Sequence, residues 1–341
     1  MAFPKIATSI GCSKRLFSPF YFIRSVSSLP TLQESIKTAV ESKSYQQIPD
    51  LLIESGEFCN KENPFSFLST FPEKNRIQAI DELLQSFVPI RPRSSLRVAY
   101  SYLLSYSLQT PNPLPLALAI IQRTSRSGCI PNPQINLLLS TAWIDRRAKS
   151  QSVTNLLNEM RSIGYYPDCG TCNYLISSLC SIDQLEEAVK VLNGMSKARC
   201  TPDLDSYGSI ISKMCALRKS REAFRMMKEM VEKFGLNPRQ ETVLKVVASM
   251  RINNEMWGAV EMIKLLENAG CLLGFEIHDL AVKGCLERRQ YVLAGKSALR
   301  MSRRGFIPYI TTRQKVVERL ASIGEVELAS AVRQSFVVLK S

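Results

Sequence analysis

Small residues recur at nearly constant spacing through the second half of this 341-residue chain. Alanines follow one another at steps of 35, 36, 35 and 35 residues, at Ala188, Ala223, Ala259, Ala294 and Ala329. Glycines keep the same period, with Arg199 in one of their places, at Gly128, Gly164, Gly235, Gly270 and Gly305. A period near 35 residues is typical of stacked two-helix units, so we expect a row of similar modules rather than one globular core.

The clearest unit spans residues 169–203. Its first helix is predicted from apolar residues on one face, at Leu175, Ile176, Leu179 and Cys180. Its second helix has a similar stripe, at Ala188, Val189, Leu192 and Met195. Asp183 and Glu186 have the spacing of a capping box for the second helix, and Pro202 closes the unit because proline disfavours helix in the residue before it.

The same template divides the rest of the chain. We expect a transit peptide over residues 1–30, a degenerate helical region over 31–90 with helical pieces near 31–55 and 75–87, and a repeat array over 91–341. The expected units are about 91–132, 133–168, 169–203, 204–239, 240–274, 275–309 and a partial unit at 310–341. The fold class that follows is an all-α solenoid of helix-turn-helix repeats.

The N-terminal stretch has the composition of an organellar leader. No acidic residue precedes Glu34, whereas this stretch contains four basic residues and six serines. A disordered tail is the alternative. A secretory signal fits less well, because Pro19 interrupts the apolar run around Phe20. Basic residues among aromatic ones favour the mitochondrion, with the chloroplast as the alternative destination.

The unit at residues 169–203 resembles the pentatricopeptide repeat (PPR) family, in its pure P-type form from plant organelles. The resemblance covers about residues 91–335, and its residues are Asn173 to Ile176, Leu179, Cys180, Leu185 to Ala188, Met195, Pro202 and Asp203. The tetratricopeptide repeat is the nearest competitor, but its 34-residue period and its Trp and Leu-Gly pattern are absent. The resemblance implies a right-handed superhelix that binds single-stranded RNA.

In this family the fifth and last residues of a unit select one base. The resemblance therefore implies that Asn173 and Asp203 are base-reading residues, in a combination that would select uracil. Both residue types also cap helices, so Asn173 as a cap of the first helix and Asp203 as a cap of the next remain open.

Other units depart from this pattern. Their corresponding pairs are Gly208 with Arg239, Leu244 with Gly274, and Asp279 with Tyr309. Glycine and leucine side chains offer no hydrogen bond to a base edge. The second position, which in the family usually holds an aliphatic residue against the base, is occupied by Gly170, Asp205, Glu241, Glu276 and Thr311. A long sequence-specific RNA footprint is therefore not expected.

The charge balance favours a polyanionic partner. Lys and Arg outnumber Asp and Glu by 44 to 30, which gives a net charge of +14. Seven basic residues face a single acid, Glu287, in one candidate patch, made of Lys283, Arg288, Arg289, Lys296, Arg300, Arg303 and Arg304. We expect single-stranded organellar RNA as the partner. The alternative is a protein-interaction scaffold associated with an organellar ribosome or ribonucleoprotein.

Catalytic, metal and cofactor chemistry have no signature here. Cys169 and Cys172 form a CxxC, but no second CxxC and no nearby histidine completes a zinc site. The sole histidine, His278, begins no His-x-Glu motif of the kind a zinc deaminase needs. The ten cysteines are too sparse for a disulfide scaffold and recur at repeat spacing. We expect no enzyme activity, no cofactor, no small-molecule substrate and no membrane segment.

Overall fold

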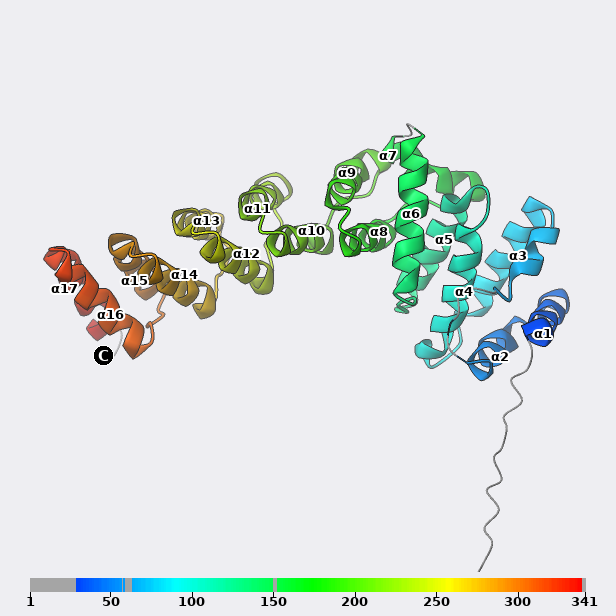
Figure 1. Ribbon diagram of the computed structural model, residues 1–341, viewed down its shortest axis with the longest axis horizontal. Coiled ribbons are helices and arrows are strands. Elements are labelled where there is room, and N and C mark those ends of the chain that lie inside the picture. The colour runs from blue at the N-terminus through cyan, green and yellow to red at the C-terminus, as the bar shows by residue number, and fades with distance from the viewer. Residues whose placement is uncertain (1–28, 57, 59–62, 150–151, 339–341) are drawn as a thin grey trace, which may run out of the picture.

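The structure is a computed structural model that describes residues 29–338, except 57, 59–62 and 150–151. The regular elements in this part are all helical (Figure 1). An N-terminal block contains α1 (Leu29–Glu41), η1 (Tyr45–Gln47), α2 (Ile48–Glu54), η2 (Ser66–Thr70), α3 (Glu73–Ser86), η3 (Arg93–Ser95), α4 (Leu96–Leu108), α5 (Pro113–Arg126), α6 (Gln134–Ala148), α7 (Val153–Asn158) and η4 (Glu159–Ile163). The all-α prediction is confirmed.

The second half of the chain forms an arm of five helix pairs. Its helices are α8 (Cys169–Ser181), α9 (Leu185–Met195), α10 (Leu204–Ala216), α11 (Ser220–Phe234), α12 (Gln240–Ile252), α13 (Met256–Asn268), α14 (Phe275–Glu287), α15 (Tyr291–Arg303), α16 (Ile310–Ser322) and α17 (Val326–Val338). A short η5 (Ser196–Ala198) extends α9. The first helix of every pair has 13 residues and begins at the first residue of an expected unit. None of the described helices is both long and apolar enough to cross a bilayer.

The helix pairs stack into two layers. The first helices α8, α10, α12, α14 and α16 contact one another in sequence, and each also packs on the second helix of its own pair. In Figure 1 the first helices run along the lower side of the arm and the second helices along its upper side. This is the solenoid arrangement, in which each unit buries its apolar face against its neighbours.

The recurring glycines, which we call the glycine ladder, lie at the ends of the second helices. Gly128, Gly164, Gly235, Gly270 and Gly305 all have a φ between 62° and 83°. This left-handed conformation is nearly free for glycine and strained for other residues, so it explains why glycine recurs there. Arg199 occupies the same place with a φ of 66°.

One expected cap is wrong. Asp183 lies in the turn before α9 with a φ of 63°, and Gln184 is the residue at the N-cap position. The carboxylate of Asp183 instead lies 2.5 Å from Lys213 Nζ of α10, so it links two neighbouring repeats. A left-handed residue cannot hold the extended conformation that an N-cap uses.

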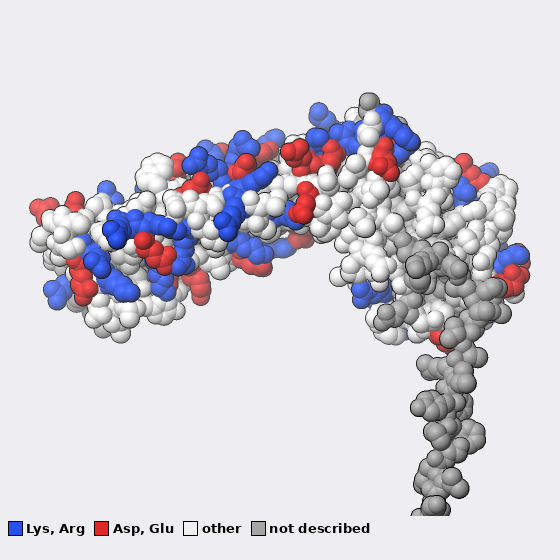
Figure 2. All heavy atoms as spheres, in the orientation of Figure 1, with Lys and Arg blue, Asp and Glu red and all other residues white. Residues whose placement is uncertain are grey.

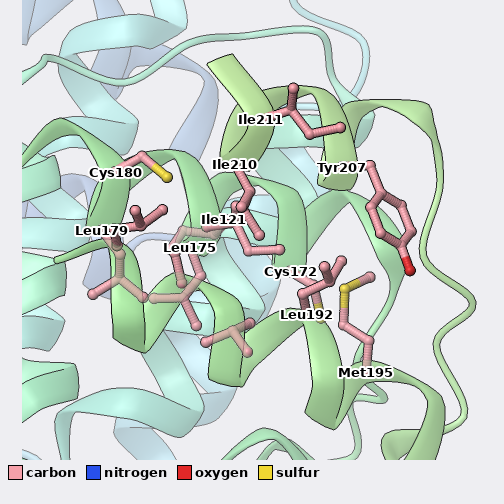
Figure 3. Packing of buried hydrophobic residues seen from close by; sticks show 14 of the residues in the cluster. Ile121, Cys172, Leu175, Leu179, Cys180, Leu192, Met195, Tyr207, Ile210 and Ile211 are labelled. Atoms are coloured by element: carbon pink, nitrogen blue, oxygen red, sulfur yellow. The ribbon is translucent and has the colours of Figure 1, made fainter. Parts of the chain in front are cut away.

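The alanine ladder lies in the core. Ala188, Ala223, Ala259 and Ala294 are fully buried, and Ala329 is nearly so. Figure 3 shows larger side chains of one part of this core, with Ile121 of α5, Leu175 of α8, Leu192 of α9 and Ile210 of α10 in one cluster. A small side chain at the ladder position lets paired helices approach closely. The expected leader lies outside the described residues, except for the two residues that begin α1.

Candidate nucleic-acid interface

Asn173 and Asp203 lie side by side at the junction of two repeats. The amide nitrogen of Asn173, in the second turn of α8, is 3.0 Å and 3.1 Å from the carboxylate oxygens of Asp203. The hydroxyl of Ser206 in α10 donates to the side-chain oxygen Oδ1 of Asn173 over 2.5 Å. Both side chains are half-buried. The structure therefore brings together the two residues that the sequence singled out.

Asp203 is also the N-cap of α10. Its Oδ1 accepts from the backbone N–H groups of Asp205 and Ser206, each over 2.9 Å, and Ser206 Oγ completes a capping box. Partial burial raises the pKa of Asp203, but hydrogen bonds from Cys169, the Ser206 backbone and Asn173 outweigh it and leave this pKa below its ordinary value. The carboxylate is thus ionised and acts as a hydrogen-bond acceptor.

Asn173 does not cap its own helix. The N-cap of α8 is Asp168, whose side chain accepts from the backbone N–H of Thr171 over 2.9 Å. The capping interpretation is therefore right for Asp203 and wrong for Asn173. The hydrogen bonds of Asn173 go to Asp203, the last residue of its own unit, and to Ser206 of the next unit, which fixes its amide at the repeat junction.

The other fifth-and-last pairs do not form comparable sites. Arg239 pairs with Asp205 over 2.6 Å, and Gly208 offers no side chain to complete the pair. Leu244 is half-buried, and Gly274 donates its backbone N–H to Gln240 over 2.8 Å. At the second position Glu241 pairs with Lys245 over 2.6 Å. These acids are exposed at the starts of the first helices, as Glu276 is.

In the unit at residues 275–309 both members of the pair, Asp279 and Tyr309, contact other side chains of the same unit. Asp279 is buried, and one of its oxygens lies 2.7 Å from Lys283 Nζ while the other has no partner. Lys283 Nζ in turn lies 4.9 Å from the ring centroid of Tyr309. Tyr309 also packs edge-on against Phe275 at 5.1 Å between centroids. Asp279 is therefore poorly placed to meet a base.

The seven residues of the candidate basic patch do not form one surface. Lys283 lies on the first helix α14, Arg288 and Arg289 lie in the turn that follows, and Lys296, Arg300 and Arg303 lie on the second helix α15, with Arg304 at its end. Lys296, Arg303 and Arg304 are exposed on the second-helix layer, away from the layer of Asn173. The patch thus divides between two layers and a turn.

Two of these arginines bind a buried acid that the sequence analysis missed. Glu267 of α13 accepts from Arg300 Nη1 over 2.7 Å and from Arg304 Nε over 3.1 Å, and its side chain is only 2% exposed. His278 Nε2 lies 3.8 Å from the same carboxylate. Glu267 follows the buried Ile263 of α13 by four residues, so the helical period of the sequence already predicts that this acid is buried. Arg300 and Arg304 therefore join repeats.

The CxxC residues lie in the packing between repeats. Cys169 donates its thiol proton to Asp203 over 3.0 Å, and burial together with this contact raises the pKa of Cys169 to about 12. The hydrogen bond with Cys200 and burial raise the pKa of Cys172 as well. Such thiols stay protonated and are poor nucleophiles. Among the described residues, no cluster of three or more His, Cys, Asp or Glu side chains could hold a metal ion.

Two sequence profiles agree with the repeat pattern in part of the chain. Sequence profiles match residues 167–216 as the PPR repeat family and residues 205–233 as a PPR repeat. Among solved structures, the pentatricopeptide repeat protein PPR10 from maize gives a TM-score of 0.42 at 15% identity, over 92% of this chain and 47% of the maize chain, so this chain spans about half of it. The PPR domain of Arabidopsis thaliana protein-only RNase P 1, in complex with tRNA, gives 0.35 at 13% identity, over 75% of this chain and 97% of that domain.

A relative in Arabidopsis thaliana, described as a pentatricopeptide repeat-containing protein, is far more similar in sequence. It is 58% identical over 320 residues, which cover 94% of this chain and 93% of the relative. Identity at this level over nearly the full length of both chains implies the same fold and the same repeats. The chain belongs to the pentatricopeptide repeat family.

Proposed function

We propose that this protein binds single-stranded RNA in an organelle and supports RNA processing, stability or translation without catalysis. The proposed organelle is the mitochondrion, and the chloroplast is the alternative. The observation that carries the proposal is the contact between Asn173 and Asp203, which join an amide and an ionised carboxylate at one repeat junction. The leader composition supports the destination.

The chemistry of this pair suits uracil. The pairing edge of uracil has an N–H donor between two carbonyl acceptors, and the Asp203 carboxylate is an acceptor while the Asn173 amide is a donor. The amide nitrogen carries two N–H groups, so one can stay on the carboxylate while the other donates to the base. Ser206 donates to the amide oxygen and so holds the orientation of the amide plane.

The first experiment is ultraviolet crosslinking of the tagged protein in the organelle, followed by sequencing of the recovered RNA. We expect one short footprint, since among the four units from 169 to 309 only the unit at residues 169–203 has a complete pair. Absence of recovered RNA would contradict every RNA-binding role.

The second experiment tests the pair itself. Fluorescence anisotropy would compare 12-nucleotide RNAs that differ only in one central base. Asp203→Asn keeps a residue type that caps helices but replaces an acceptor by a donor, so the preference for uracil should fall while the helix content stays constant. An unchanged preference in the variant would exclude Asp203 from base reading.

A protein-interaction scaffold associated with a ribosome is the second candidate function. The ion pairs Asp205–Arg239 and Glu241–Lys245 favour it, because they occupy base-facing positions with charges that cancel. Broad coverage of ribosomal RNA in the crosslinking experiment, in place of one footprint, would support this candidate.

A further inference from the structure

Three helix-to-helix turns lie in a row along one edge of the arm. They are residues 217–219, 253–255 and 288–290, which join the helices of three consecutive pairs. Asn253 Nδ2 donates to the carbonyl oxygen of Arg218 over 2.7 Å and to Ser220 Oγ over 2.6 Å. Arg288 Nη2 donates to the carbonyl oxygen of Arg251 over 3.3 Å. These contacts between repeats make the turns one continuous surface.

Large apolar side chains are exposed at this edge. Trp257, in the first turn of α13, is 67% exposed, Ile252 at the end of α12 is 58% exposed, and Leu217 at the end of α10 is 41% exposed. Single exposed apolar residues are common, but a group of three on adjoining turns, one of them tryptophan, is typical of an interaction surface. We call the surface formed by Leu217, Arg218, Lys219, Ile252, Trp257, Arg288 and Arg289 the turn edge.

The turn edge is strongly basic. Residues 217–221, 251–257 and 287–290 contain six basic and two acidic residues. Both acids are already paired, Glu255 with Arg221 over 2.7 Å and Glu287 with Arg251 over 2.5 Å. Within the described part of the chain, no ion pair involves Arg218, Lys219, Arg288 or Arg289. Figure 2 shows Lys and Arg distributed along the arm, whereas the same face of the N-terminal block is mostly uncharged.

We propose that the turn edge binds an acidic segment of a partner protein that also carries aliphatic or aromatic side chains. Unpaired cations at the rim match carboxylates, and Trp257, Ile252 and Leu217 match apolar anchors. An RNA strand would use the cations and could stack on the tryptophan, but it gains little from exposed leucine and isoleucine. The aliphatic side chains therefore favour a protein.

The turn edge is distinct from the base-reading pair. Asn173 lies in the second turn of a first helix, whereas the turns follow the last residues of the first helices. Asn173 is the fifth residue of the 13-residue helix α8, so about 13 Å of helix, at about 1.5 Å per residue, separates its level from that of the turns. The protein could thus hold RNA and a protein partner together.

Tryptophan fluorescence can monitor the turn edge directly. The chain has two tryptophans, of which Trp143 is fully buried and Trp257 is exposed. Quenching by acrylamide therefore acts on Trp257. The probe is a display library of random 16-residue peptides selected on the full chain, followed by quenching and anisotropy measurements with the selected peptides.

We expect the selected peptides to combine Asp or Glu with Leu, Phe or Trp, and to protect Trp257 from acrylamide. The double variant Lys219→Glu/Arg289→Glu should weaken their binding by about tenfold or more, because it places two negative charges opposite the carboxylates of the peptide. Leu217→Ser/Ile252→Ser should weaken it similarly. The matched control Arg225→Glu/Lys264→Glu changes the same charge at exposed positions on α11 and α13, and should leave binding within about twofold.

Three results would overturn the proposal. They are selection of peptides without acidic residues, equal binding by the turn-edge variants and the control, and protection of Trp257 by a single-stranded RNA but by no selected peptide. Binding of RNA by the Lys219→Glu/Arg289→Glu variant, measured separately by anisotropy, should be unchanged. The proposal can therefore fail while the proposed RNA function stands, and the reverse also holds.

Discussion

The N-terminal block and the arm build helix layers in different ways. Among the side chains that the structure describes, five aromatic ones are fully buried: Phe65, Phe87, Tyr100 and Trp143 lie in the block, and Tyr207 lies in the arm. The arm fills its core with alanine, methionine and valine at repeated positions instead. Its first helices all have 13 residues, whereas α2 has seven and α7 has six.

This difference shows how strongly the packing between the units of a solenoid depends on repeated residues. In the arm each interface is a copy of the previous one, so small residues at a fixed period are enough to define it. In the block each interface is individual, and large aromatic side chains fix it by shape. Residues 31–90 of the block show no clear period for that reason, although the described part of this region also consists of helices.

The largest expected effect separates the two cores. Trp143→Ala removes a fully buried side chain of α6 and should cost about 3–5 kcal/mol, because the surrounding helices cannot close the cavity. Met227→Leu in α11 leaves no cavity, because it conserves the volume of a buried side chain in the arm, and it should cost less than about 1.5 kcal/mol. Denaturant unfolding with hydrogen exchange resolved by segment measures both. Equal loss of protection in block and arm after Trp143→Ala would show that they unfold as one unit.

The alanine ladder gives the next effect. Ala259→Leu places extra methyl groups where the paired helices approach and should cost about 1–3 kcal/mol. Ala248, half-exposed on the first helix of the same unit, is the control, and Ala248→Leu should change stability by less than about 0.5 kcal/mol. A tolerated leucine at position 259 would mean that the period does not report close packing.

A smaller gain is expected where the glycine ladder is broken. Arg199 has a φ of 66°, so Arg199→Gly removes backbone strain and should stabilise the protein by about 1 kcal/mol. Gly235→Arg introduces the same strain at an equivalent place and should destabilise by about 1–2 kcal/mol. Thermal melting of both variants tests the pair. The prediction requires that the two variants shift the melting temperature in opposite directions.

The smallest effect is a pH dependence in the arm. Burial lowers the pKa of His278, and the arginines 300 and 304 lower it further, although Glu267 opposes them. Protonation therefore favours the unfolded chain. The contribution of His278 to stability is complete above its unfolded pKa of about 6.5 and is lost as pH falls below that value toward the lowered folded pKa.

The measurement is the unfolding midpoint between pH 7.5 and 5.5. The wild type should lose stability toward pH 5.5, and His278→Gln should lose less. Because the chain has one histidine, an unchanged slope in the variant would assign the pH dependence to other groups.

Much of the arm could be predicted because its signals are local. The turns at Gly164 and Gly235 need a left-handed residue, and the alanines at 188 and 223 need a small one, so the spacing appears in the sequence itself. Of the residues that the sequence offered as helix caps, Asp203 is an N-cap in the structure, whereas Asp183 and Asn173 are not. A capping motif does not show which residue adopts the extended backbone conformation that an N-cap needs. Glu267 was missed because its partners, Arg300 and Arg304, lie one repeat later.

The all-α repeat class, the period and the burial of the recurring alanines follow from the sequence alone, since these depend on side-chain size and backbone conformation at single positions. Which charged side chains meet depends on how the repeats stack. The stacking joins Asn173 to Asp203, pairs Asp205 with Arg239, and divides the seven basic residues of the candidate patch between two layers and a turn. The physical reason is that packing within a helix follows local periodicity, whereas an ion pair between repeats depends on the geometry of stacking, which no single unit contains.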